Sequence, residues 1–282
     1  MTVVAQGSGT LEAIPRPGSV FQRNLNLVRE LSITSFKLKY TGSALGYIWS
    51  LVKPLMLFGI MYLVFSLLLK VGKGDIDFPV QLLIAIVAWT FFTEATSTAM
   101  NAVAGNGDLI RKAYFPRWIL VVASTTSALL TFAINTSLVL VVTLVLGHLD
   151  LTLRSLLAPL YYLELIVLVL GLSLLLSSLF VFFRDLGHIW EILSLVLFYG
   201  SGVVFPIMLI KSTTLLDLAG LNPVAQIIQD LRYSLVQSSP LNHSMASIIG
   251  PLVTIPIVIS ILALVVGYLV FTRLTPKFAE SL

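Results

Sequence analysis

Six long apolar runs dominate this sequence, and each is long enough to cross a lipid bilayer as a helix. A bilayer core requires about 20 mostly apolar residues per helix, and tilt accommodates the longer runs. Because lipid offers the backbone no hydrogen-bond partners, runs of this length form helices. The sequence therefore predicts an all-α, polytopic membrane protein with six transmembrane helices. The predicted spans are residues 51–69, 79–104, 118–146, 156–183, 189–209 and 252–272.

The composition agrees with a membrane protein. Hydrophobic residues make up 57% of the 282 residues and charged residues only 11%, which is outside the range of ordinary soluble domains. A chain of this length holds one membrane domain and leaves little room for a separate soluble one. Because the chain contains no Cys, disulfides, thiol catalysis and Cys-based metal sites are excluded.

The seventeen Lys and Arg residues orient the predicted helices. Twelve lie in the N-terminal segment, in the connections after the second and fourth runs, and in the C-terminal tail. The positive-inside rule places this side in the cytoplasm, so we expect a multi-pass protein with both termini in the cytoplasm. Because the basic residues serve orientation, we expect no nucleic-acid partner. The five Lys and Arg residues predicted on the opposite, non-cytoplasmic side are Lys70, Lys73, Arg154, Lys211 and Arg232.

An amphipathic segment precedes the first apolar run. Phe21 and Leu25, then Val28 and Leu31, recur at the spacing of one helical face, and charged residues occupy the other face. A basic amphipathic helix beside a span is typical of a helix in the membrane interface. It is either a passive anchor or a collar that also touches a cytoplasmic partner. The expected organisation is a flexible cytoplasmic tail, an interface helix and a six-span membrane domain, at residues 1–18, 19–40 and 41–282.

The segment that leads into the first run is basic and aromatic. Its lysines suit anionic headgroups, and its Tyr and Trp side chains suit the membrane interface. The order of its residues resembles the permeases of type-2 ABC exporters, particularly those that move lipid-linked polysaccharides such as O-antigens, capsules, wall teichoic acids and galactans. The matching residues are Lys39, Tyr40, Ser43, Leu45, Gly46, Trp49 and Pro54.

Two later stretches support the resemblance. Residues 105–116 look like the family's cytoplasmic connection between spans two and three, and residues 182–186 resemble its Phe-Arg-Asp element between spans four and five. The three stretches follow the family's order, and the hydropathy layout matches nearly the whole chain apart from the N-terminal tail. The resemblance implies the transmembrane subunit of an ATP-driven exporter that moves a lipid-linked polysaccharide or cell-surface glycan across the bacterial cytoplasmic membrane.

The chain has no phosphate-binding loop of the GxxxxGK(S/T) type. The resemblance therefore implies a separate nucleotide-binding ATPase subunit that binds ATP and Mg²⁺, with no cofactor in this chain, which is a transporter subunit rather than an enzyme. A pair of ATP sites needs two ATPase subunits. A single bundle of six helices is too small to enclose a conduit for a polymer. We therefore expect a homodimer of this chain with two ATPase subunits.

Two cytoplasmic connections supply candidate docking residues for the ATPase. In the first, Asn106 or Asp108 caps a short helix. Leu109 and Ile110 then offer apolar contacts, and the basic residues offer charge. The alternatives are a solvated loop for the first connection and a local ion pair at a helix end for the second. The candidate set is Asn106, Gly107, Asp108, Leu109, Ile110, Arg111, Lys112, Arg184 and Asp185.

Four residues at the start of the first span form a candidate substrate entrance. They lie at the depth where a lipid-linked donor presents a negatively charged diphosphate beside its first sugar. A lysine suits the diphosphate and a tryptophan suits the sugar ring, whereas interfacial anchoring is the alternative for all four. The residues are Lys39, Tyr40, Tyr47 and Trp49.

Residues within the spans form a candidate conduit. Aromatic planes stack on the C–H faces of sugars, so they bind glycans in many registers. An intramembrane carboxylate is costly and therefore a functional candidate, although Ser and Thr neighbours could also satisfy it structurally. Packing, or contact with lipid, is the alternative for each ring. The candidates are Tyr62, Trp89, Phe92, Glu94, Phe132, Phe198 and Tyr199.

The end of the fifth run is interrupted by Gly200, Gly202 and Pro206. The stretch that follows, residues 221–236, is moderately apolar but too polar to span. Irregular backbone at membrane depth is tolerated only where protein or a cavity covers it. Together with the resemblance, this pattern predicts a re-entrant outer segment between spans five and six that acts as an outer gate.

Three other functions compete with polysaccharide export. A type-2 exporter of another lipid or a drug shares the same signatures. An ion-gradient-driven secondary transporter is disfavoured because the two halves lack similarity and no Lys, Arg or His lies mid-membrane. An intramembrane hydrolase is disfavoured because His148, His188 and His243 all lie in loops or at span edges.

Overall fold

The computed structural model describes residues 20–42, 45–72, 75–112, 115–148, 152–236 and 242–278. The regular elements of these residues are all helices, and none is a strand, which confirms the all-α class. The predicted tail, residues 1–18, and Ser43 of the matched segment lie outside the described residues. The side chains of Arg111 and Lys112 also lie outside them.

In the described part of the chain, five helices are long and apolar enough to cross a membrane. Each corresponds to one of the predicted apolar runs. They cover Gly46–Leu68, Phe78–Ala104, Trp118–Val145, Leu153–Phe180 and Met245–Lys277. Their main α-helices are α2 (Trp49–Met61), α3 (Phe78–Ala104), α5 (Trp118–Val145), α6 (Ala158–Phe180) and α11 (Thr254–Leu274), and the short π and 3-10 segments are η1 (Gly46–Ile48), η2 (Tyr62–Leu68), η3 (Leu153–Leu157), η5 (Gly250–Val253) and η6 (Thr275–Lys277).

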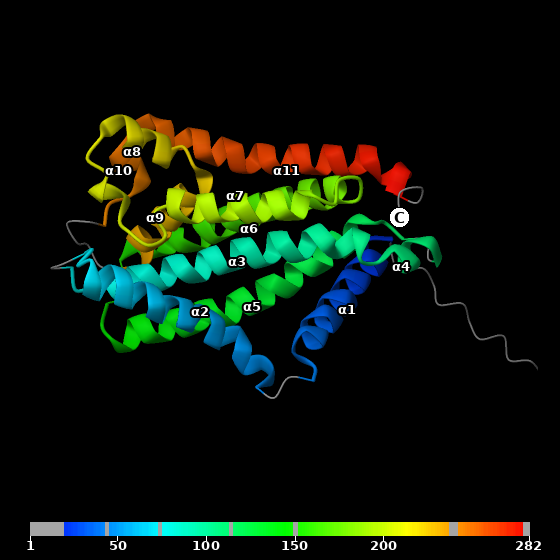
Figure 1. Ribbon diagram of the computed structural model, residues 1–282, viewed down its shortest axis with the longest axis horizontal. Helices are drawn as coiled ribbons and strands as arrows, with labels where there is room; N and C mark the ends of the chain where they lie inside the picture. Colours follow the sequence, from blue (N-terminus) through cyan, green and yellow to red (C-terminus); the bar gives the residue numbers. More distant parts are fainter. Residues whose placement is uncertain are drawn as a thin grey trace, which may run out of the picture.

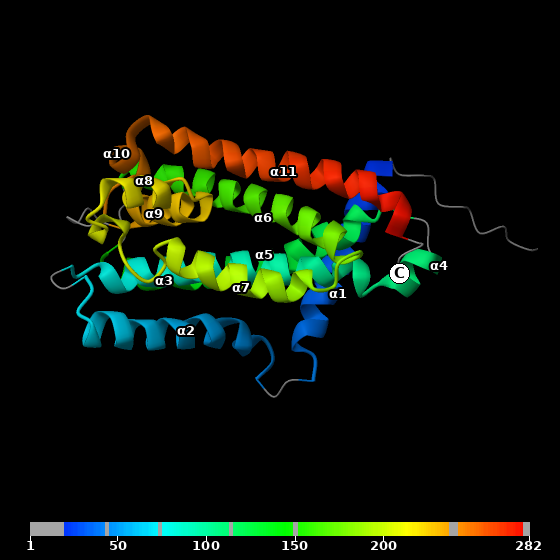
Figure 2. The same cartoon turned by 45° about the horizontal axis from the view of Figure 1, so that its top comes forward.

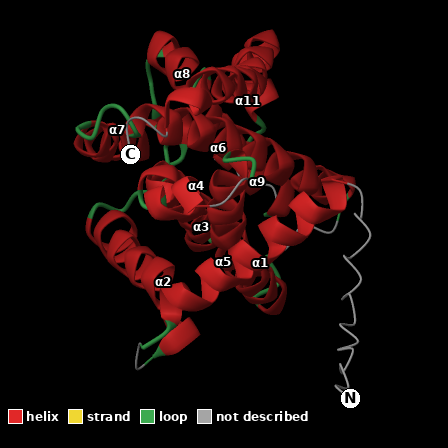
Figure 3. Ribbon diagram, turned by 90° about the vertical axis from the view of Figure 1, so that its right-hand side faces the viewer, coloured by secondary structure: helices red, strands yellow, loops and turns green. Residues whose placement is uncertain are grey.

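Helix α3 forms the centre of the bundle. Helices α5 and α6 pack against it, and α11 packs against α6. The end-on view in Figure 3 shows α3 surrounded by other helices, with α2 to one side. Buried side chains run along almost the whole of α3, so the core of a single chain is filled and is centred on this helix.

The bundle has two distinct ends (Figure 1). Helix α4 (Gly107–Lys112) and the C-terminal end of α11 lie at one end, and the short helices α8 (Thr213–Gly220), α9 (Pro223–Leu235) and α10 (Met245–Ile249) gather at the other. Figure 2 shows the same separation in a second view. We call these the α4 end and the α9 end. The distribution of Lys and Arg predicts that the α4 end faces the cytoplasm.

Two glycines allow α6 and α11 to approach closely. A Cβ atom built on Gly267 would lie 2.1 Å from the carbonyl oxygen of Gly171. A Cβ atom built on Gly171 would lie 2.3 Å from the backbone nitrogen of Leu264. Small residues at such crossings let two transmembrane backbones pack against each other, where van der Waals contact replaces the hydrophobic effect. This crossing joins the last span to the rest of the bundle.

The fifth predicted run forms a helix shorter than a span. Helix α7 (Leu186–Gly200) has 15 residues, or about 22 Å at 1.5 Å per residue, whereas a bilayer core is about 30 Å thick. The chain turns just after it, where Gly202 has a φ of +61°, a backbone conformation that favours glycine. The predicted continuous span over residues 189–209 is therefore not found, and the count of six spans is not confirmed.

The segment between α7 and α11 folds back onto the α9 end of the bundle. Asn222 caps α9, because its side-chain oxygen accepts a hydrogen bond from the backbone N–H of Val224 at 3.0 Å. Arg232, on the same helix, is fully buried. Its guanidinium donates hydrogen bonds to the carbonyl oxygens of Gln81 at 3.1 Å, Gly202 at 2.9 Å and Val203 at 2.6 Å. Arg232 therefore ties α9 both to α3 and to the turn after α7.

The helix before the first span, α1 (Val20–Tyr40), packs mainly against α5. Its buried residues are Ser32 and Tyr40, and of the predicted apolar face Leu31 packs partly against the core. Phe21 and Leu25 of that face are 73% and 56% exposed. The C-terminal half of the helix is therefore held by protein, and its N-terminal apolar residues point away from the bundle.

Candidate functional site

An ion pair links the predicted entrance to the predicted conduit. Lys39 lies in the last turn of α1 and Glu94 lies within α3, and their side chains form a salt bridge. The two residues are 55 positions apart in sequence. Their side chains are only 30% and 20% exposed, so the pair is partly shielded from solvent and the charge of each group satisfies the other.

Two adjoining cavities run along α3, and the ion pair borders the first of them. The first cavity, of about 140 Å³, is lined by the ion pair and by further residues of α1, α3 and α5. The second cavity, of about 240 Å³, extends toward the α4 end. Both are bordered by Ser35 of α1, Thr98 of α3 and Ser124 of α5. We call the joined space the α1–α3–α5 trough. Its further lining residues are Ser127 and Ala128 around the first cavity and Leu31, Asn101, Ala102, Asn106, Leu120 and Ala123 around the second.

Apart from the charged pair and Asn106, which was predicted as a docking residue, the polar residues of the trough were not among the predicted site residues. Ser124 and Ser127 are three residues apart in an apolar helix, which is the spacing of one helical face. That spacing was the sequence feature that could have indicated a polar lining. A serine in a membrane helix usually satisfies its hydroxyl on its own backbone, so the spacing alone does not distinguish a polar lining from local hydrogen bonding.

The remaining entrance residues separate into buried and exposed positions. Tyr40 is buried, and its hydroxyl lies 3.5 Å from the Oγ1 atom of Thr131 on α5. Its ring contacts those of Phe36 and Tyr47, with centroids 5.4 and 5.3 Å away. Tyr47 is 51% exposed and Trp49 is 36% exposed. Tyr40 therefore fixes α1 against α5, whereas Tyr47 and Trp49 lie at the surface, where a lipid or a sugar can reach them.

Four of the conduit candidates belong to the core. Trp89, Phe92, Phe132 and Phe198 are at most 7% exposed, and Trp89 lies with its ring centroid 5.2 Å from that of Phe92 and 5.5 Å from that of Phe198. These rings pack the interior of one chain, so none presents a face to a passing glycan. We therefore correct the sequence-based interpretation, and we treat these four as packing residues.

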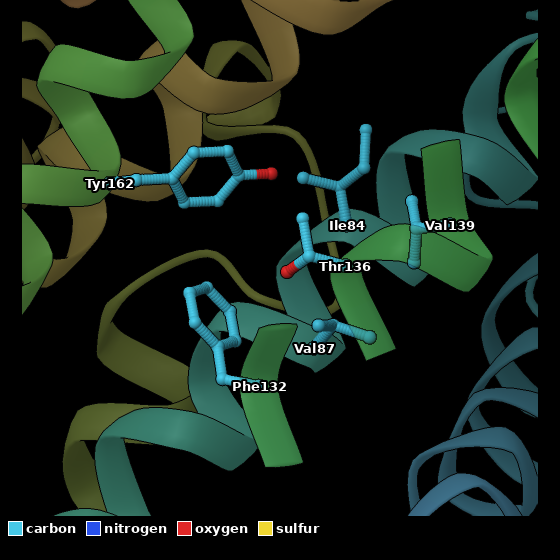
Figure 4. A pocket seen from close by; sticks show the side chains of 6 residues that line it. All are labelled: Ile84, Val87, Phe132, Thr136, Val139 and Tyr162. Carbon is cyan, nitrogen blue, oxygen red and sulfur yellow. The ribbon is translucent and has the colours of Figure 1, made fainter. Parts of the chain in front are cut away.

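Figure 4 shows the surroundings of Phe132. Its ring lies beside Tyr162 of α6 and Thr136 of α5, and Ile84 and Val87 of α3 close the far side (Figure 4). The space between these side chains does not admit a water molecule. It is a packing defect between three helices rather than a passage.

The other three conduit candidates remain at least partly accessible. Tyr62 is half-buried in η2 and stacks on Phe58, with ring centroids 5.7 Å apart. Tyr199 is 50% exposed near the end of α7. Glu94 lines the α1–α3–α5 trough. Helices α2 and α7 lie on the periphery of the bundle, but only Tyr199 is largely exposed, because Tyr62 packs partly against the core.

The first docking connection forms α4, as expected for a short helix after α3. The side chain of Asn106 does not cap it but donates a hydrogen bond to the carbonyl oxygen of Ala102 at 2.8 Å. Ile110 is 7% exposed and packs with Phe278 of the C-terminal segment in the core, so it is not available to a partner. Asp108 and Leu109 are exposed, and only the backbone of Arg111 and Lys112 is described.

The second docking connection lies between α6 and α7, at the same end of the bundle as α4 (Figure 2). Arg184 and Asp185 are exposed. The guanidinium of Arg184 lies over the ring of Phe180, 5.3 Å from its centroid. Among the described residues, the structure pairs neither Arg184 nor Asp185 with an opposite charge, so the local ion pair, which was the alternative to docking, is not formed. Both side chains face solvent at the α4 end.

Comparison with known proteins identifies the family. The ABC-2 type transporter family matches residues 26–236, which is most of the chain. The chain belongs to the ABC-2 type transporter family. The resemblance to type-2 ABC permeases found in the sequence is therefore confirmed. The matched region includes α1 from residue 26 onward, all of the trough and the segment up to the end of α9.

Individual relatives point to one branch of this family. The chain is 26% identical over 248 residues to the O-antigen export system permease protein RfbA of Klebsiella pneumoniae, which covers 87% of this chain and 91% of that protein. A protein of the same name from Myxococcus xanthus is 26% identical over 193 residues, covering 68% of this chain and 73% of the relative. A second Klebsiella pneumoniae protein of that name is 24% identical over 253 residues, covering 87% and 91%.

Proposed function

We propose that this ABC-2 permease is the transmembrane subunit of an exporter that moves a lipid-linked polysaccharide from the cytoplasmic side across the bacterial cytoplasmic membrane. The observation that carries this proposal is the similarity to O-antigen export permeases over nearly the whole chain. The polar trough and the exposed aromatic residues beside it supply surfaces suited to a charged headgroup and to sugars. They support the glycan cargo over a drug, which would need a mostly apolar site.

The proposed exporter is a homodimer with its conduit between the two copies. A single chain is filled at its centre by α3 and by the aromatic side chains that pack on it, so it encloses no passage for a polymer. Helix α2 and its π-helical continuation are largely exposed, and so is α7. These peripheral helices carry Tyr62 and Tyr199, which would then face the conduit from either copy.

The sixth crossing of the proposed topology is made by α7 together with residues 201–209. Helix α7 begins at the α4 end and runs toward the α9 end, and α11 returns in the opposite direction (Figures 1 and 2). An even number of crossings returns the C-terminus to the side where α1 lies. The turn at Gly202 and the short η4 (Ile207–Leu209) replace the missing helical turns. The α9 segment then forms the outer gate, covering this irregular backbone as the membrane requires.

The proposed ATPase contact is the α4 end. Asp108, Leu109, Arg184 and Asp185 are exposed there, on two connections that follow different helices. An apolar side chain surrounded by charged ones is a common arrangement at the centre of a protein interface. The partner ATPase, present in two copies, would bind ATP and Mg²⁺.

Reconstitution tests the proposed function. The chain is co-expressed with its ABC ATPase, the complex is purified into vesicles, and ATP-dependent transfer of lipid-linked glycan into a compartment is measured. We expect transfer that stops when the ATPase cannot hydrolyse ATP, and accumulation of lipid-linked glycan in cells lacking the chain. Transport that persists without ATP hydrolysis would indicate an ion-gradient-driven carrier. ATPase stimulation by drugs but not by lipid-linked glycan would indicate a different type-2 cargo.

A further inference from the structure

The α1–α3–α5 trough contains hydroxyl groups that have no partner. Ser35, Ser124 and Ser127 line the cavity of about 140 Å³ beside the ion pair. In the described residues, none of the three hydroxyls makes a hydrogen bond. Ser127 is 7% exposed, whereas Ser124 is half-buried and Ser35 is exposed, and all three side chains border the cavity. Because no protein group among the described residues uses these hydroxyls, each can donate a hydrogen bond to a polar ligand in this cavity.

The charges of the trough indicate the sign of that ligand. Lys39 supplies its ammonium group at one side of the cavity, and Glu94 is the carboxylate that neutralises it. Hydroxyl donors around a lysine are the groups that bind phosphate oxygens. A carboxylate that pairs with the same lysine holds the position that a phosphate oxygen would take. Glu94 therefore resembles an internal substitute for an anionic ligand.

The shape of the trough provides access for such a ligand. The second cavity, of about 240 Å³, shares Ser35 and Ser124 with the first and reaches Asn106 beside α4. The distance along α3 from Asn106 back to Glu94 is 12 residues, or about 18 Å at 1.5 Å per residue. A polar route thus leads from the predicted cytoplasmic surface to the ion pair, between helices whose other faces are apolar.

We propose that the α1–α3–α5 trough binds the phosphate-bearing headgroup of a lipid, and that Glu94 competes with this phosphate for Lys39. The incoming phosphate takes the ammonium group of Lys39 and accepts hydrogen bonds from Ser35, Ser124 and Ser127. Without a ligand, Glu94 keeps Lys39 paired and holds α1 against α3. A diphosphate carries more negative charge than one carboxylate, so it displaces Glu94 where a neutral lipid does not. This choice of ligand depends on the proposed function, in which a diphosphate links the glycan to its lipid carrier.

Direct binding measurements test this competition. The full-length chain, in complex with its ATPase, is placed in phosphatidylcholine nanodiscs, and the binding of a radiolabelled polyprenyl diphosphate is measured. Glu94→Gln removes the competitor and is expected to tighten binding about fivefold, in line with the strength of a partly exposed ion pair. Lys39→Gln is expected to weaken binding about tenfold, because a charge-assisted contact is lost.

Two matched variants control for general electrostatics. Lys37→Gln removes an exposed lysine from the same helix, and Glu191→Gln removes an exposed carboxylate from α7. Both are expected to bind the diphosphate like the unmodified chain. Equal effects of Lys37→Gln and Lys39→Gln would overturn the proposal, because attraction to the basic surface would then explain the binding.

Other outcomes separate the sources of the phosphate and the two proposals. Displacement of the probe by phosphatidylglycerol, at equal concentration, would show that the trough binds phospholipid headgroups generally. Failure of phosphatidylglycerol to compete would show selection of the diphosphate carrier. Unchanged or weaker binding of the diphosphate to the Glu94→Gln variant, with normal glycan export by the unmodified complex, would overturn the proposed competition without affecting the proposed function. Loss of export in the unmodified complex would instead count against the proposed function.

Discussion

At the scale of single residues, buried Arg232 is the most consequential charge of the α9 end. It is counted in the sequence among the basic residues of the non-cytoplasmic loops, yet its side chain is fully buried and satisfied by three backbone carbonyls. A buried charge is tolerated when its hydrogen bonds are complete. Here those bonds also fix the irregular chain after α7, so one side chain stabilises the segment proposed as the outer gate.

Replacing Arg232 with Ala is expected to destabilise the protein by about 3 kcal/mol. The carbonyl oxygens of Gln81, Gly202 and Val203 would lose their donor in a buried site, and each unsatisfied group carries a desolvation cost. Thermal unfolding in detergent measures the change. Arg29→Ala, at an exposed position of α1, is the matched control. Equal stability of the two variants would show that the hydrogen bonds of Arg232 do not stabilise the α9 end.

At the scale of elements, helix contacts follow the size of side chains more than their polarity. Interior and lipid are both apolar in a membrane protein, so close approach depends on small residues that remove steric obstruction. The α6–α11 crossing illustrates this, because its two glycines bring backbone atoms into direct contact. Helix α2 shows the opposite case, since Gly59 has no atom within 4 Å of a built Cβ.

Alanine at Gly267 is therefore expected to destabilise the bundle by about 2 kcal/mol, because overpacking forces α6 and α11 apart. The built Cβ lies 2.1 Å from backbone oxygen, which cannot move as a flexible side chain can. Gly59→Ala, within α2, is expected to be neutral or slightly stabilising in the same assay. Thermal unfolding of both variants gives the comparison, and similar melting curves would contradict a steric role for Gly267.

The α4 element gives a second prediction, on partner binding. Leu109→Asp is expected to reduce co-purification of the ATPase at least tenfold while membrane insertion is retained, because Leu109 is exposed at the proposed interface. Ile110→Asp is expected to unfold the α4 end, since Ile110 packs with Phe278. Leu215→Asp, exposed on α8 at the other end, controls for the added charge. Normal ATPase recovery with Leu109→Asp would place the contact elsewhere.

At the scale of the whole molecule, the position of the conduit is the main consequence of the packing. Helices α2 and α11 lie on opposite sides of the bundle (Figure 2). The interior between them is filled around α3. The proposed passage for a polymer is therefore one formed with a second copy, along helices that one chain leaves exposed.

Cysteine cross-linking tests that arrangement, because the natural chain has no Cys. Tyr62→Cys, half-buried in η2, and Tyr199→Cys, 50% exposed on α7, are expected to give covalent dimers on mild oxidation in membranes. Tyr268→Cys, 54% exposed, is on α11, the helix that lies across the bundle from α2 (Figure 2), and is expected to remain monomeric. Cross-linking from Tyr268→Cys alone would place the dimer contact, and with it the conduit, on the opposite face of the bundle.

The sequence by itself determined the membrane class, the positions of five long helices, the break after Tyr199 and the family. These follow from local properties, since a long apolar run in lipid satisfies its backbone only as a helix, and Gly and Pro act on the chain where they stand. The Phe-Arg-Asp and Lys-Tyr stretches were equally readable, because they are contiguous in the chain.

Only the tertiary structure decided which residues face one another. Lys39 and Glu94 are 55 residues apart and meet because α1 crosses α5 beside α3. Trp89, Phe92, Phe132 and Phe198 turned out to be core rather than conduit. In a membrane protein, a ring facing lipid and a ring facing the interior are both in apolar surroundings, so the apolar pattern does not reveal the inward face of a helix. That face is set by packing between helices, which residues distant in sequence determine together.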